Sequence, residues 1–261
     1  RSHVLTIKNP HRVTIFKELD RYNGQVGATL LPNGEIIVIF NQMRGMRHLD
    51  FDSIGMVRSH DGGESWGDYA SVWQATNTFG SDTPSIRLLR DNTLLINFVV
   101  TAFVLNLNQG ISTDYGPQHR LENMRECDGV WLMRSSDWGH TWSDAYKASV
   151  SPMRWGQPVD EPIELPDGTL LMAVQGQRRA RAYEENEEPI RSFCIRSDNG
   201  GKDWEHWSTI AYDPAGIISF GEPALGRTAD GVLVCMMRTH HQPRRRHQNL
   251  WLAYSTNDGE S

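Results

Sequence analysis

The residues Ser135-Ser136-Asp137-Trp138-Gly139-His140-Thr141-Trp142 are one copy of a motif, Ser-x-Asp/Asn-x-Gly-x-Ser/Thr/Asp-Trp, that occurs four times in this chain of 261 residues. The other copies begin at Ser59, Ser197 and Ser255, and the last one ends before its Trp. In such a motif the Asp or Asn accepts hydrogen bonds from turn amides, the Gly takes a positive φ, and the Trp covers the hairpin beneath it. A calcium or catalytic role is the weaker alternative, because the residues recur with the fold and not with one site. We therefore expect four structural turn residues, which are Asp61, Asp137, Asn199 and Asn257.

The same order of apolar strands and Gly or Asn turns surrounds each motif. In the first unit, Val26–Leu31 and Ile36–Phe40 flank a turn, and Ile54–Arg58 leads into the motif. Four short strands per unit are typical of a β-propeller blade. A β-sandwich also uses short alternating strands, but it does not need one turn motif at the same place in every unit. The sequence thus predicts an all-β chain with a single, incomplete propeller domain over residues 1–261 and about four blades, at approximately 24–75, 82–150, 160–212 and 218–261.

The ends of an incomplete ring have a physical consequence. Blades at the ends present uncovered apolar faces, which predicts association, for example as a homo-oligomer through blade edges. Val13–Phe16 precedes the first blade, and we hypothesise that it adds the outer strand of the last one.

Composition excludes several classes of protein. The formal net charge of -6 with scattered acidic residues argues against a nucleic-acid partner. The most apolar run, Leu94–Leu105, is too short to span a membrane and is interrupted by polar residues, so it predicts a buried strand. The three cysteines are widely spaced, and neither a disulfide framework, a zinc site nor a cofactor is expected. The chain opens without a signal-peptide core, which leaves its location undetermined, and a secreted or periplasmic parent protein is compatible with it.

Long loops between the second and third strands should lie on the face opposite the motifs. These loops are Met43–Asp52, Thr101–Asp128, Gln177–Pro189 and Thr239–Gln248. A planar guanidinium fork matches a carboxylate, so arginines gathered on one rim predict an acidic sugar or a sugar acid as ligand. The alternative is that the clusters are solvated charges, balanced in part by glutamates of the same loops. The arginines concerned are Arg44, Arg47, Arg120, Arg125, Arg178, Arg179, Arg181, Arg238, Arg244, Arg245 and Arg246.

The strands themselves carry further candidates near the predicted axis. Arg238 ends the second strand of its blade, opposite Glu222 at the start of the first strand, so the two should be cross-strand neighbours. Such a pair either anchors a ligand and takes part in catalysis or is a structural ion pair. Blade three has Asp160 and Glu161 at the corresponding start, and blade two has Asp82. We take Asp82, Glu161 and Arg238 as candidate substrate-binding residues.

Acid/base chemistry is best placed in the loop Arg44–Asp52. It holds two carboxylates, two guanidinium groups and an imidazole. Asp50 could protonate a leaving oxygen if closure over a substrate raised its pKa. His48, Asp50 and Asp52 match no familiar metal-ligand spacing, and we predict no metal site.

The motifs, the blade lengths and the run Phe220–Leu225, followed by Met236-Met237-Arg238, resemble the sialidase (neuraminidase) superfamily with BNR repeats, in which the motif is called the Asp box. The resemblance implies a six-bladed propeller in which three arginines bind a substrate carboxylate, an Asp is the acid/base, and a Glu activates a Tyr nucleophile. By motif position, it implies that Glu222 is that Glu and Arg238 one of the arginines. It further implies Asp50 as acid/base, Arg44 or Arg47 as a neighbouring substrate contact, and Asp82 as another pocket acid.

Two departures from the family pattern matter. The first strand reads Gly24-Gln25-Val26-Gly27 where members of the family usually have an arginine, and Gln25 cannot replace a guanidinium. The Tyr nucleophile and the last arginine belong to fifth and sixth blades. We therefore expect exo-hydrolysis of a terminal acidic sugar by a full-length parent protein and an incomplete or inactive site in this chain. The alternatives are a polysaccharide lyase or other uronate-active propeller enzyme, assisted by His48 or His240, and a non-catalytic propeller that binds glycan or protein.

Overall fold

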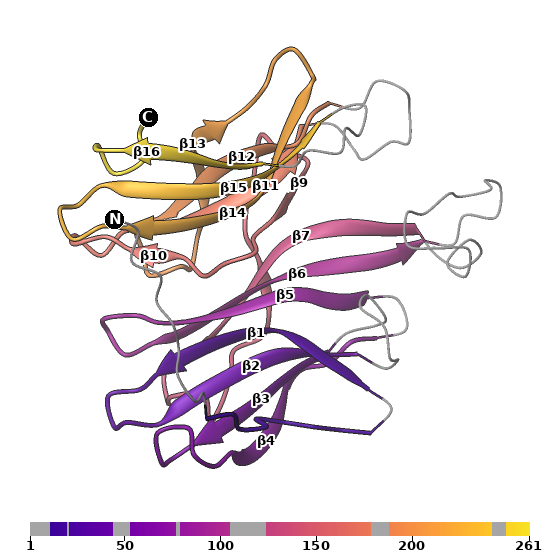
Figure 1. The fold of residues 1–261 in the computed structure, drawn as a ribbon, viewed down its shortest axis with the longest axis vertical. Coiled ribbons are helices and arrows are strands. Elements are labelled where there is room, and N and C mark those ends of the chain that lie inside the picture. The colour runs from indigo at the N-terminus through magenta and orange to yellow at the C-terminus, as the bar shows by residue number, and fades with distance from the viewer. Residues whose placement is uncertain are drawn as a thin grey trace.

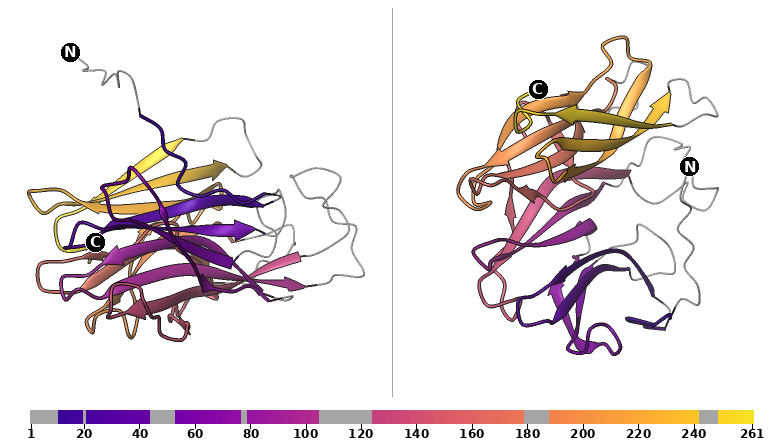
Figure 2. Two further views of the ribbon diagram at one scale, coloured as in Figure 1. Left: turned by 90° about the horizontal axis from the view of Figure 1, so that it is seen from below. Right: turned by 60° about the vertical axis from the view of Figure 1, so that its left-hand side comes forward.

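The computed structural model describes residues 11–19, 21–43, 53–76, 79–104, 124–178, 188–241 and 249–261. Within these ranges every regular element is a β-strand, and the strands form four antiparallel sheets that fan around a common axis (Figure 1). The right-hand view in Figure 2 keeps the same order, with the indigo sheet at one end and the orange and yellow sheets at the other. The all-β propeller architecture predicted from the repeated motif is confirmed, and the four sheets are called blades one to four below.

The strands of each blade follow one another in chain order, and the first strand faces the neighbouring blade at the axis. Their bounds are β1 (Tyr22–Leu30), β2 (Ile36–Met43), β3 (Ser53–Ser59) and β4 (Gly67–Trp73) in blade one; β5 (Phe79–Leu88), β6 (Leu94–Val104), β7 (Met124–Ser135) and β8 (Tyr146–Lys147) in blade two; β9 (Trp155–Gln157), β10 (Ile163–Glu164), β11 (Leu170–Gln177), β12 (Arg191–Ser197) and β13 (Glu205–Ala211) in blade three; and β14 (Ile218–Arg227), β15 (Leu233–His241) and β16 (Leu250–Ser255) in blade four.

The turn between the first two strands is the same in every blade. In blade one the Leu31 N–H donates to the Glu35 carbonyl at 2.8 Å, and equivalent bonds close the turns at Leu89, Leu165 and Thr228. Each turn needs a residue with positive φ, and this is Gly34, Asn92, Gly168 or Gly231. A residue without Cβ, or Asn, adopts this conformation most readily, which explains the Gly or Asn seen in the sequence at each turn.

The Asp-box turns have the predicted contacts. Asp137 Oδ1 accepts the Thr141 N–H at 2.9 Å, and Asp61 Oδ1 accepts the Ser65 N–H at the same distance. The hydrogen bonds from Ser65 lower the pKa of Asp61 to about 2, and those from Thr141 lower that of Asp137 as well. Asn199 and Asn257 accept the equivalent amides in the other two turns. The first Ser of the motif adds an unpredicted contact, because its Oγ accepts the amide of the motif Gly in all four copies.

The arginines that precede the first and second boxes contact the next blade. Arg58, with a side chain that is 4% exposed, donates from Nη2 to the Trp138 carbonyl in the second box at 2.7 Å. Arg134 lies against Gly201 of the third box, whereas the guanidinium of Arg196 lies over the Trp207 ring of its own blade. The boxes therefore hold the ring of blades together as well as their own hairpins.

Apolar clusters fill the spaces between blades. Phe98 belongs to the cluster between blades one and two, and Phe193 to the cluster between blades two and three; both are fully buried. Burial of one such side chain contributes about 1.5–3 kcal/mol relative to full exposure. The cluster between blades three and four includes the buried Cys235.

Two expectations about the chain's start are corrected. Val13–Phe16 does not add a strand to blade four; Phe16 stacks on Tyr69 at 4.9 Å and contacts Phe40 at 5.0 Å, both in blade one. Aromatic pairs of this kind stabilise by about 0.5–1.5 kcal/mol beyond the burial of their area, which favours this position of Phe16. The first strand also begins at Tyr22, earlier than the predicted Val26. In the described part of the chain, no helix is long and apolar enough to cross a membrane.

Candidate functional site

The first strand of three blades is interrupted at an equivalent position. The residues at these bulges, Gln25, Thr83 and Glu222, have φ angles of 51°, 47° and 48°. The strand pairing shifts around each of them, between Gly24 and Gly27 in the case of Gln25. Positive φ costs a residue with a side chain of order 1–3 kcal/mol, so the surrounding contacts must hold these bulges in place.

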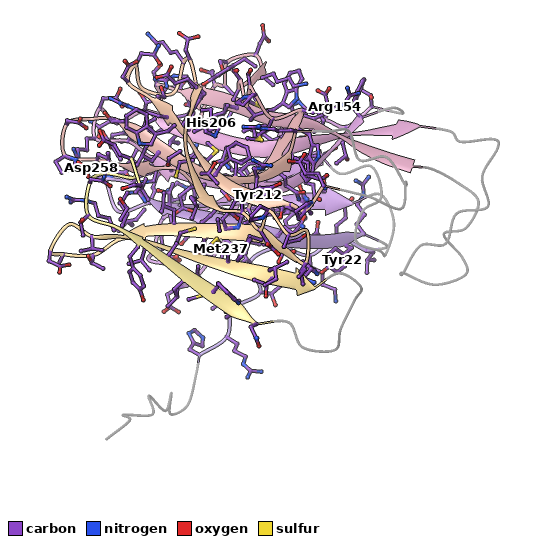
Figure 3. All side chains as sticks on the ribbon, turned by 90° about the horizontal axis from the view of Figure 1, so that it is seen from above. Tyr22, Arg154, His206, Tyr212, Met237 and Asp258 are labelled. Carbon is purple, nitrogen blue, oxygen red and sulfur yellow. The ribbon has the colours of Figure 1, made fainter. Side chains whose placement is uncertain are left out.

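The bulges lie away from the Asp boxes. Ile36 pairs with both Leu30 and Ser59, which puts the first hairpin turn and the box at one end of the blade. Gly24, next to the bulge, pairs with Asn41 near the other end of β2. Figure 3 shows this polarity, with Asp258 of the fourth box at one end of the molecule and Tyr22, the first residue of β1, at the other. The bulges are therefore on the side that leads to the long loops.

Hydrogen bonds connect the bulges of blades one and two through buried amides. Gln25 Oε1 accepts from Asn41 Nδ2 and from the Thr83 N–H, the latter at 3.4 Å. Asn41 Oδ1 in turn accepts the hydroxyl of Ser81 at 3.0 Å. Asn41 and Ser81 are fully buried, so these bonds are shielded from water and fix the side chains.

The chain of contacts continues into blades three and four. Thr83 Oγ1 donates to the Pro158 carbonyl at 2.9 Å, just after β9. Gln175 Nε2 donates to Gln157 Oε1 at 3.0 Å, and Gln175 Oε1 accepts the Glu222 N–H at 2.7 Å. Polar side chains from all four blades thus line one connected zone, here called the axial site.

Glu222 and Arg238 meet as their positions predicted. Arg238 Nη1 donates to Glu222 Oε1 at 2.7 Å, and Arg238 pairs in register with Gly221. Their side chains are 40% (Arg238) and 47% (Glu222) exposed. An ion pair this open contributes only about 0–1 kcal/mol to stability. The ion pair therefore stabilises the fold by no more than the positive φ of Glu222 costs, and its contribution to stability alone does not explain why Glu222 lies at the bulge.

Carboxyl groups of blades two and three lie on the same first-strand segments as these contacts. Asp82 is 7% exposed and accepts the Thr83 N–H at 3.0 Å, so it supports the bulge. Asp160 Oδ1 accepts the Glu161 N–H at 3.0 Å, and Glu161 Oε1 lies 3.8 Å from Arg87 Nη1. Burial raises the pKa of Glu161 to about 7, helped by the hydrogen bond and charge of Asp160 and opposed by Arg87. A carboxyl with a raised pKa such as that of Glu161 is suited to general acid chemistry near neutral pH.

Three predicted site residues lie outside the described residues. They are Arg44, Arg47 and Asp50, and most arginines of the predicted rim lie there as well. Arg178 is described; its backbone N–H donates to Glu188 Oε2 at 2.9 Å. The acidic-sugar prediction therefore depends mainly on Arg238 among the described residues.

The sequence did not identify the amides that connect the blades. Asn41, Gln157 and Gln175 sit within apolar strands, where a single polar residue gives no signal of its own. A weak signal was present in Asp82-Thr83-Pro84, Asp160-Glu161-Pro162 and Gly221-Glu222-Pro223, which put a polar residue before a Pro in three blades. Pro lacks an N–H and interrupts strand pairing, so such triplets mark a bulge.

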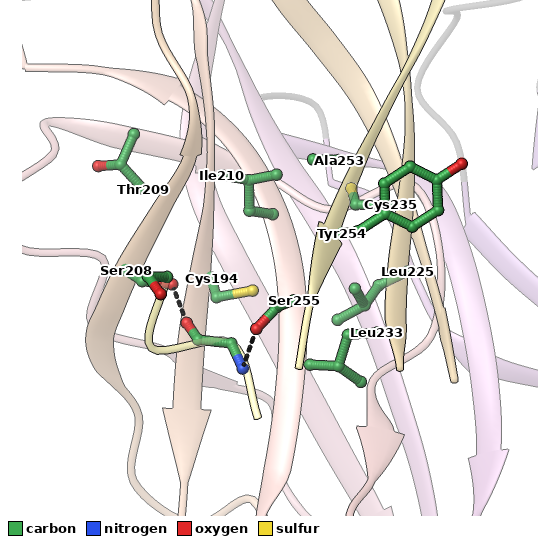
Figure 4. A pocket seen from close by; sticks show the side chains of 12 residues that line it. Cys194, Ser208, Thr209, Ile210, Leu225, Leu233, Cys235, Ala253, Tyr254 and Ser255 are labelled. Carbon is green, nitrogen blue, oxygen red and sulfur yellow. Dashed lines mark hydrogen bonds between the residues drawn. The ribbon is translucent and has the colours of Figure 1, made fainter. Parts of the chain in front are cut away.

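Two hollows in the described surface lie between blades three and four, close to the fourth box. One is a small cavity of about 60 Å³ beside Cys194 and Cys235 (Figure 4). Burial raises the pKa of each thiol to about 12, so both are inert apolar groups. The other hollow, of about 370 Å³, borders Arg196, Trp207 and Asp258. Neither reaches Glu222 or Arg238, and the axial site is assigned from its contacts instead.

Metal ligands do not gather among the residues described. No group of three or more His, Cys, Asp or Glu side chains there could hold a metal ion.

Comparison with known proteins identifies related sequences. The BNR repeat-like domain family matches residues 102–261, more than half of the chain. A curated sialidase from Paraclostridium sordellii is 26% identical over 223 residues, which cover 78% of this chain and 52% of the relative. This chain therefore spans about half the length of the curated relative that it matches.

Solved structures share the fold at low sequence identity. A protein of unknown function from Dyadobacter fermentans superposes with a TM-score of 0.74 at 20% identity, over 95% of this chain and 69% of that chain. A Hadza microbial sialidase superposes with a TM-score of 0.66 at 18% sequence identity, and the match covers 92% of this chain and 45% of that chain. The intramolecular trans-sialidase from Ruminococcus gnavus superposes with a TM-score of 0.64 at 13% sequence identity, and the match covers 95% of this chain and 71% of that chain. At these identities the likeness concerns the fold alone.

Proposed function

The chain belongs to the BNR repeat-like domain family, and from this premise we propose that the whole protein is a sialidase-like glycoside hydrolase that acts on terminal acidic sugars of glycans. The chain itself is a sialidase-like BNR propeller. Within the proposal, Glu222 and Asp50 are catalytic, and Arg44, Arg47, Asp82, Glu161 and Arg238 contact the sugar. The sialidase named among the relatives supports the choice of a sugar as ligand.

The observation that carries the proposal is the exposed Glu222–Arg238 pair on a strained bulge. Gln175 fixes the backbone of Glu222, and Glu222 in turn orients the guanidinium of Arg238. Arg238 can then offer its remaining N–H groups to a sugar carboxylate, which is a charge-assisted contact. Exposure leaves the pair accessible, and the fixed backbone keeps its geometry before a ligand arrives.

A non-catalytic glycan-binding propeller is the second candidate. It is favoured by Gln25, which occupies the bulge of blade one with a neutral amide that already accepts two hydrogen bonds. No tyrosine of this chain matches the nucleophile position that the family resemblance implies, so we expect binding without turnover from this chain alone. A lyase or another uronate-active enzyme remains a further alternative on the same scaffold.

One experiment separates these functions. The full-length protein is assayed with a fluorogenic sialoside and with a uronate polymer whose cleavage produces an absorbing double bond. Release of the fluorophore supports the glycosidase, and rising absorbance supports the lyase. If neither assay detects a product and the protein still binds a glycan measurably, the result supports the non-catalytic propeller.

The role of the central pair is tested on this chain by binding. E222Q and R238Q should each weaken binding of a methyl α-sialoside by at least about tenfold if the pair contacts the sugar. The same variants should change the free energy of unfolding by no more than about 1 kcal/mol, because the pair is exposed. E205Q and R227Q change exposed residues of β13 and β14 away from the axial site and serve as matched controls. Unchanged binding in E222Q and R238Q contradicts the proposal.

A further inference from the structure

The contact between blades three and four differs from the contact between blades one and two. Between blades one and two, Arg58 Nη2 donates to the carbonyl of Trp138, the residue that follows the Asp of the second box. Asp258 has the same place in the fourth box, but its carbonyl accepts Trp207 Nε1 at 3.3 Å. The indole of Trp207 thus takes the acceptor that an arginine uses between the first two blades.

Arg196 precedes the third box as Arg58 precedes the first, and it lacks the carbonyl partner that Arg58 has. Its guanidinium lies over the Trp207 ring, 4.4 Å from the ring centroid. In the described part of the chain, the Arg196 side chain makes no hydrogen bond and no ion pair. Arg58 is 4% exposed, whereas Arg196 is only half-buried. The N–H donors of Arg196 are therefore accessible to a ligand.

Arg196 borders the hollow of about 370 Å³ between blades three and four. Leu165, Leu171 and Trp207 give this hollow an apolar lining, and both leucines are buried. Pockets for small ligands typically have volumes of about 300–1000 Å³ and combine an apolar lining with a few polar groups. The hollow therefore has the size and the composition of a site for a small ligand.

The charged groups around the hollow have both signs. They are the guanidinium of Arg196 and the carboxylates of Asp167, Asp258 and Glu260. Asp167 Oδ1 accepts the Thr169 N–H at 2.9 Å. The hydrogen bonds from Thr169 lower the pKa of Asp167, and the charge of Arg196 adds to this effect, so Asp167 and Arg196 lie near each other. The carboxylates of Asp258 and Glu260 are exposed and accept no hydrogen bond from the described residues.

This combination of groups favours a neutral polyhydroxy ligand over a charged one. An anion would be repelled by three carboxylates, and a cation would be repelled by the guanidinium of Arg196. A sugar hydroxyl both donates and accepts hydrogen bonds, so it can pair with a guanidinium on one side and a carboxylate on the other. The C–H groups of a pyranose ring can pack at the same time against the indole and the leucine side chains.

We propose that this hollow, called the box-face site, binds a neutral pyranose unit through Arg196 as donor and through Asp258 and Glu260 as acceptors. Trp207 forms its apolar wall. The site lies at the end of the molecule that Asp258 marks in Figure 3, and the residues that line it do not belong to the axial site. It goes beyond the proposed function, because it gives the chain a second place of attachment to a glycan that contains neutral sugars.

The indole N–H of Trp207 reports binding at the box-face site. Nitrogen–proton NMR of the full-length protein follows this signal, which W207F identifies by its loss. The probes are methyl β-galactoside, methyl β-glucoside and methyl α-mannoside, and at least one of them should shift the Trp207 signal in a saturable way. The uronide that matches the preferred glycoside carries a carboxylate in place of the hydroxymethyl group. It should bind about 3- to 10-fold more weakly, because it adds a negative charge beside three carboxylates.

R196A and E260A test the assigned contacts. Each should weaken binding of the preferred glycoside, R196A by at least about tenfold and E260A by about 3- to 10-fold, which are the losses expected for hydrogen bonds to charged groups. Neither side chain makes a hydrogen bond to the described residues, so both variants should fold as the unmodified protein does. R227A changes an arginine at the end of β14 that does not line the hollow, and this matched control should bind normally.

The outcomes separate the box-face site from the axial site. If no neutral glycoside shifts the Trp207 signal, or if R196A and E260A bind as tightly as R227A, the proposal is wrong. It is also wrong if the matched uronide binds as tightly as the neutral glycoside. R196A should still bind a methyl α-sialoside as the unmodified protein does, and a loss of that binding would show that the two sites are not separate.

Discussion

Gln175 Oε1 in β11 accepts the backbone N–H of Glu222 in β14 at 2.7 Å, and this bond joins blade three to blade four. The Gln175 side chain is also anchored at its other end by Gln157. A buried amide of one blade therefore determines where the candidate catalytic residue of the next blade is placed. This contact helps to hold Glu222 at a φ of 48°.

Removal of the Gln175 amide should loosen Glu222. We expect Q175A to lower the free energy of unfolding by about 1–3 kcal/mol, because the Glu222 N–H loses its buried acceptor. Urea denaturation measures this loss, and binding of a methyl α-sialoside should weaken with it. Q175E keeps an acceptor oxygen and is the matched variant that should retain the bond to Glu222. Equal stability of Q175A and the unmodified chain would show that the bulge is held by other contacts.

The close approach of Gly221 to the same amide gives a second prediction. A Cβ at Gly221 would lie 2.6 Å from Gln175 Oε1, whereas a Cβ at Gly226 on the same strand would meet nothing within 4 Å. G221A should therefore displace the Gln175 side chain and cost about 1–3 kcal/mol of stability. G226A is the control and should change stability by less than about 1 kcal/mol. Similar melting temperatures for the two variants contradict the proposed packing.

The fold was predictable because its signal is repeated. The Asp box, the Gly or Asn turn and the apolar strands occur together in each unit, so errors in a single element do not change the architecture. The Glu222–Arg238 contact was predictable for a related reason, since cross-strand register follows from the turn between the two strands.

The rest of the axial site depends on contacts between blades. Asn41 and Gln175 are buried and Gln157 is half-buried. Their hydrogen-bond partners lie in another strand or another blade, and no local pattern reveals such partners. Phe16 illustrates the same limit, because its neighbours Phe40 and Tyr69 are distant in the sequence. Local periodicity reports which residues are buried, and only the assembled blades show what each buried polar group contacts.

Arg58 should contribute to the contact between blades one and two. Its guanidinium lies 3.2 Å from Glu35 Oε2 and donates to the Trp138 carbonyl, and its side chain is almost fully buried. R58M leaves the buried Trp138 carbonyl contact without its donor and takes the guanidinium away from Glu35, so it should lose about 3 kcal/mol of stability in urea denaturation. R227M, which changes an exposed arginine of β14, is the control. If R58M loses less stability than R227M, Arg58 is not needed for the contact between blades one and two.

His60 should titrate above the usual range. Its Nε2 lies 2.8 Å from Asp68 Oδ2 and its Nδ1 lies 3.4 Å from Glu35 Oε1. The hydrogen bond to Asp68, with the charges of both carboxylates, raises the pKa of His60 above 6.5 in the folded chain. Because the folded pKa is the higher one, the stabilisation is complete below about 6.5 and is lost as pH rises through the folded pKa.

Imidazole NMR checks the pKa of His60 directly. D68N removes the largest contribution and should shift the titration back toward 6.5. The difference in melting temperature between the unmodified chain and H60Q should be largest in mildly acidic solution and should shrink above the folded pKa. A titration at or below 6.5 in the unmodified chain contradicts this account.

The outer face of blade four should promote self-association. Met236 pairs in register with Leu252, and the side chains of Met236, Leu252 and Tyr254 are 45%, 47% and 64% exposed. Neighbouring apolar side chains on an open sheet face favour packing against a second apolar surface, and we propose that a second copy of this chain supplies it. Sedimentation velocity should then show a larger species as concentration rises, and the double variant M236E/L252E should sediment as a monomer throughout. V26E, which changes an exposed apolar residue of blade one, is the matched control and should still associate. A single monomeric species at high concentration in the unmodified chain contradicts the proposal, because the exposed face would then remain in contact with water.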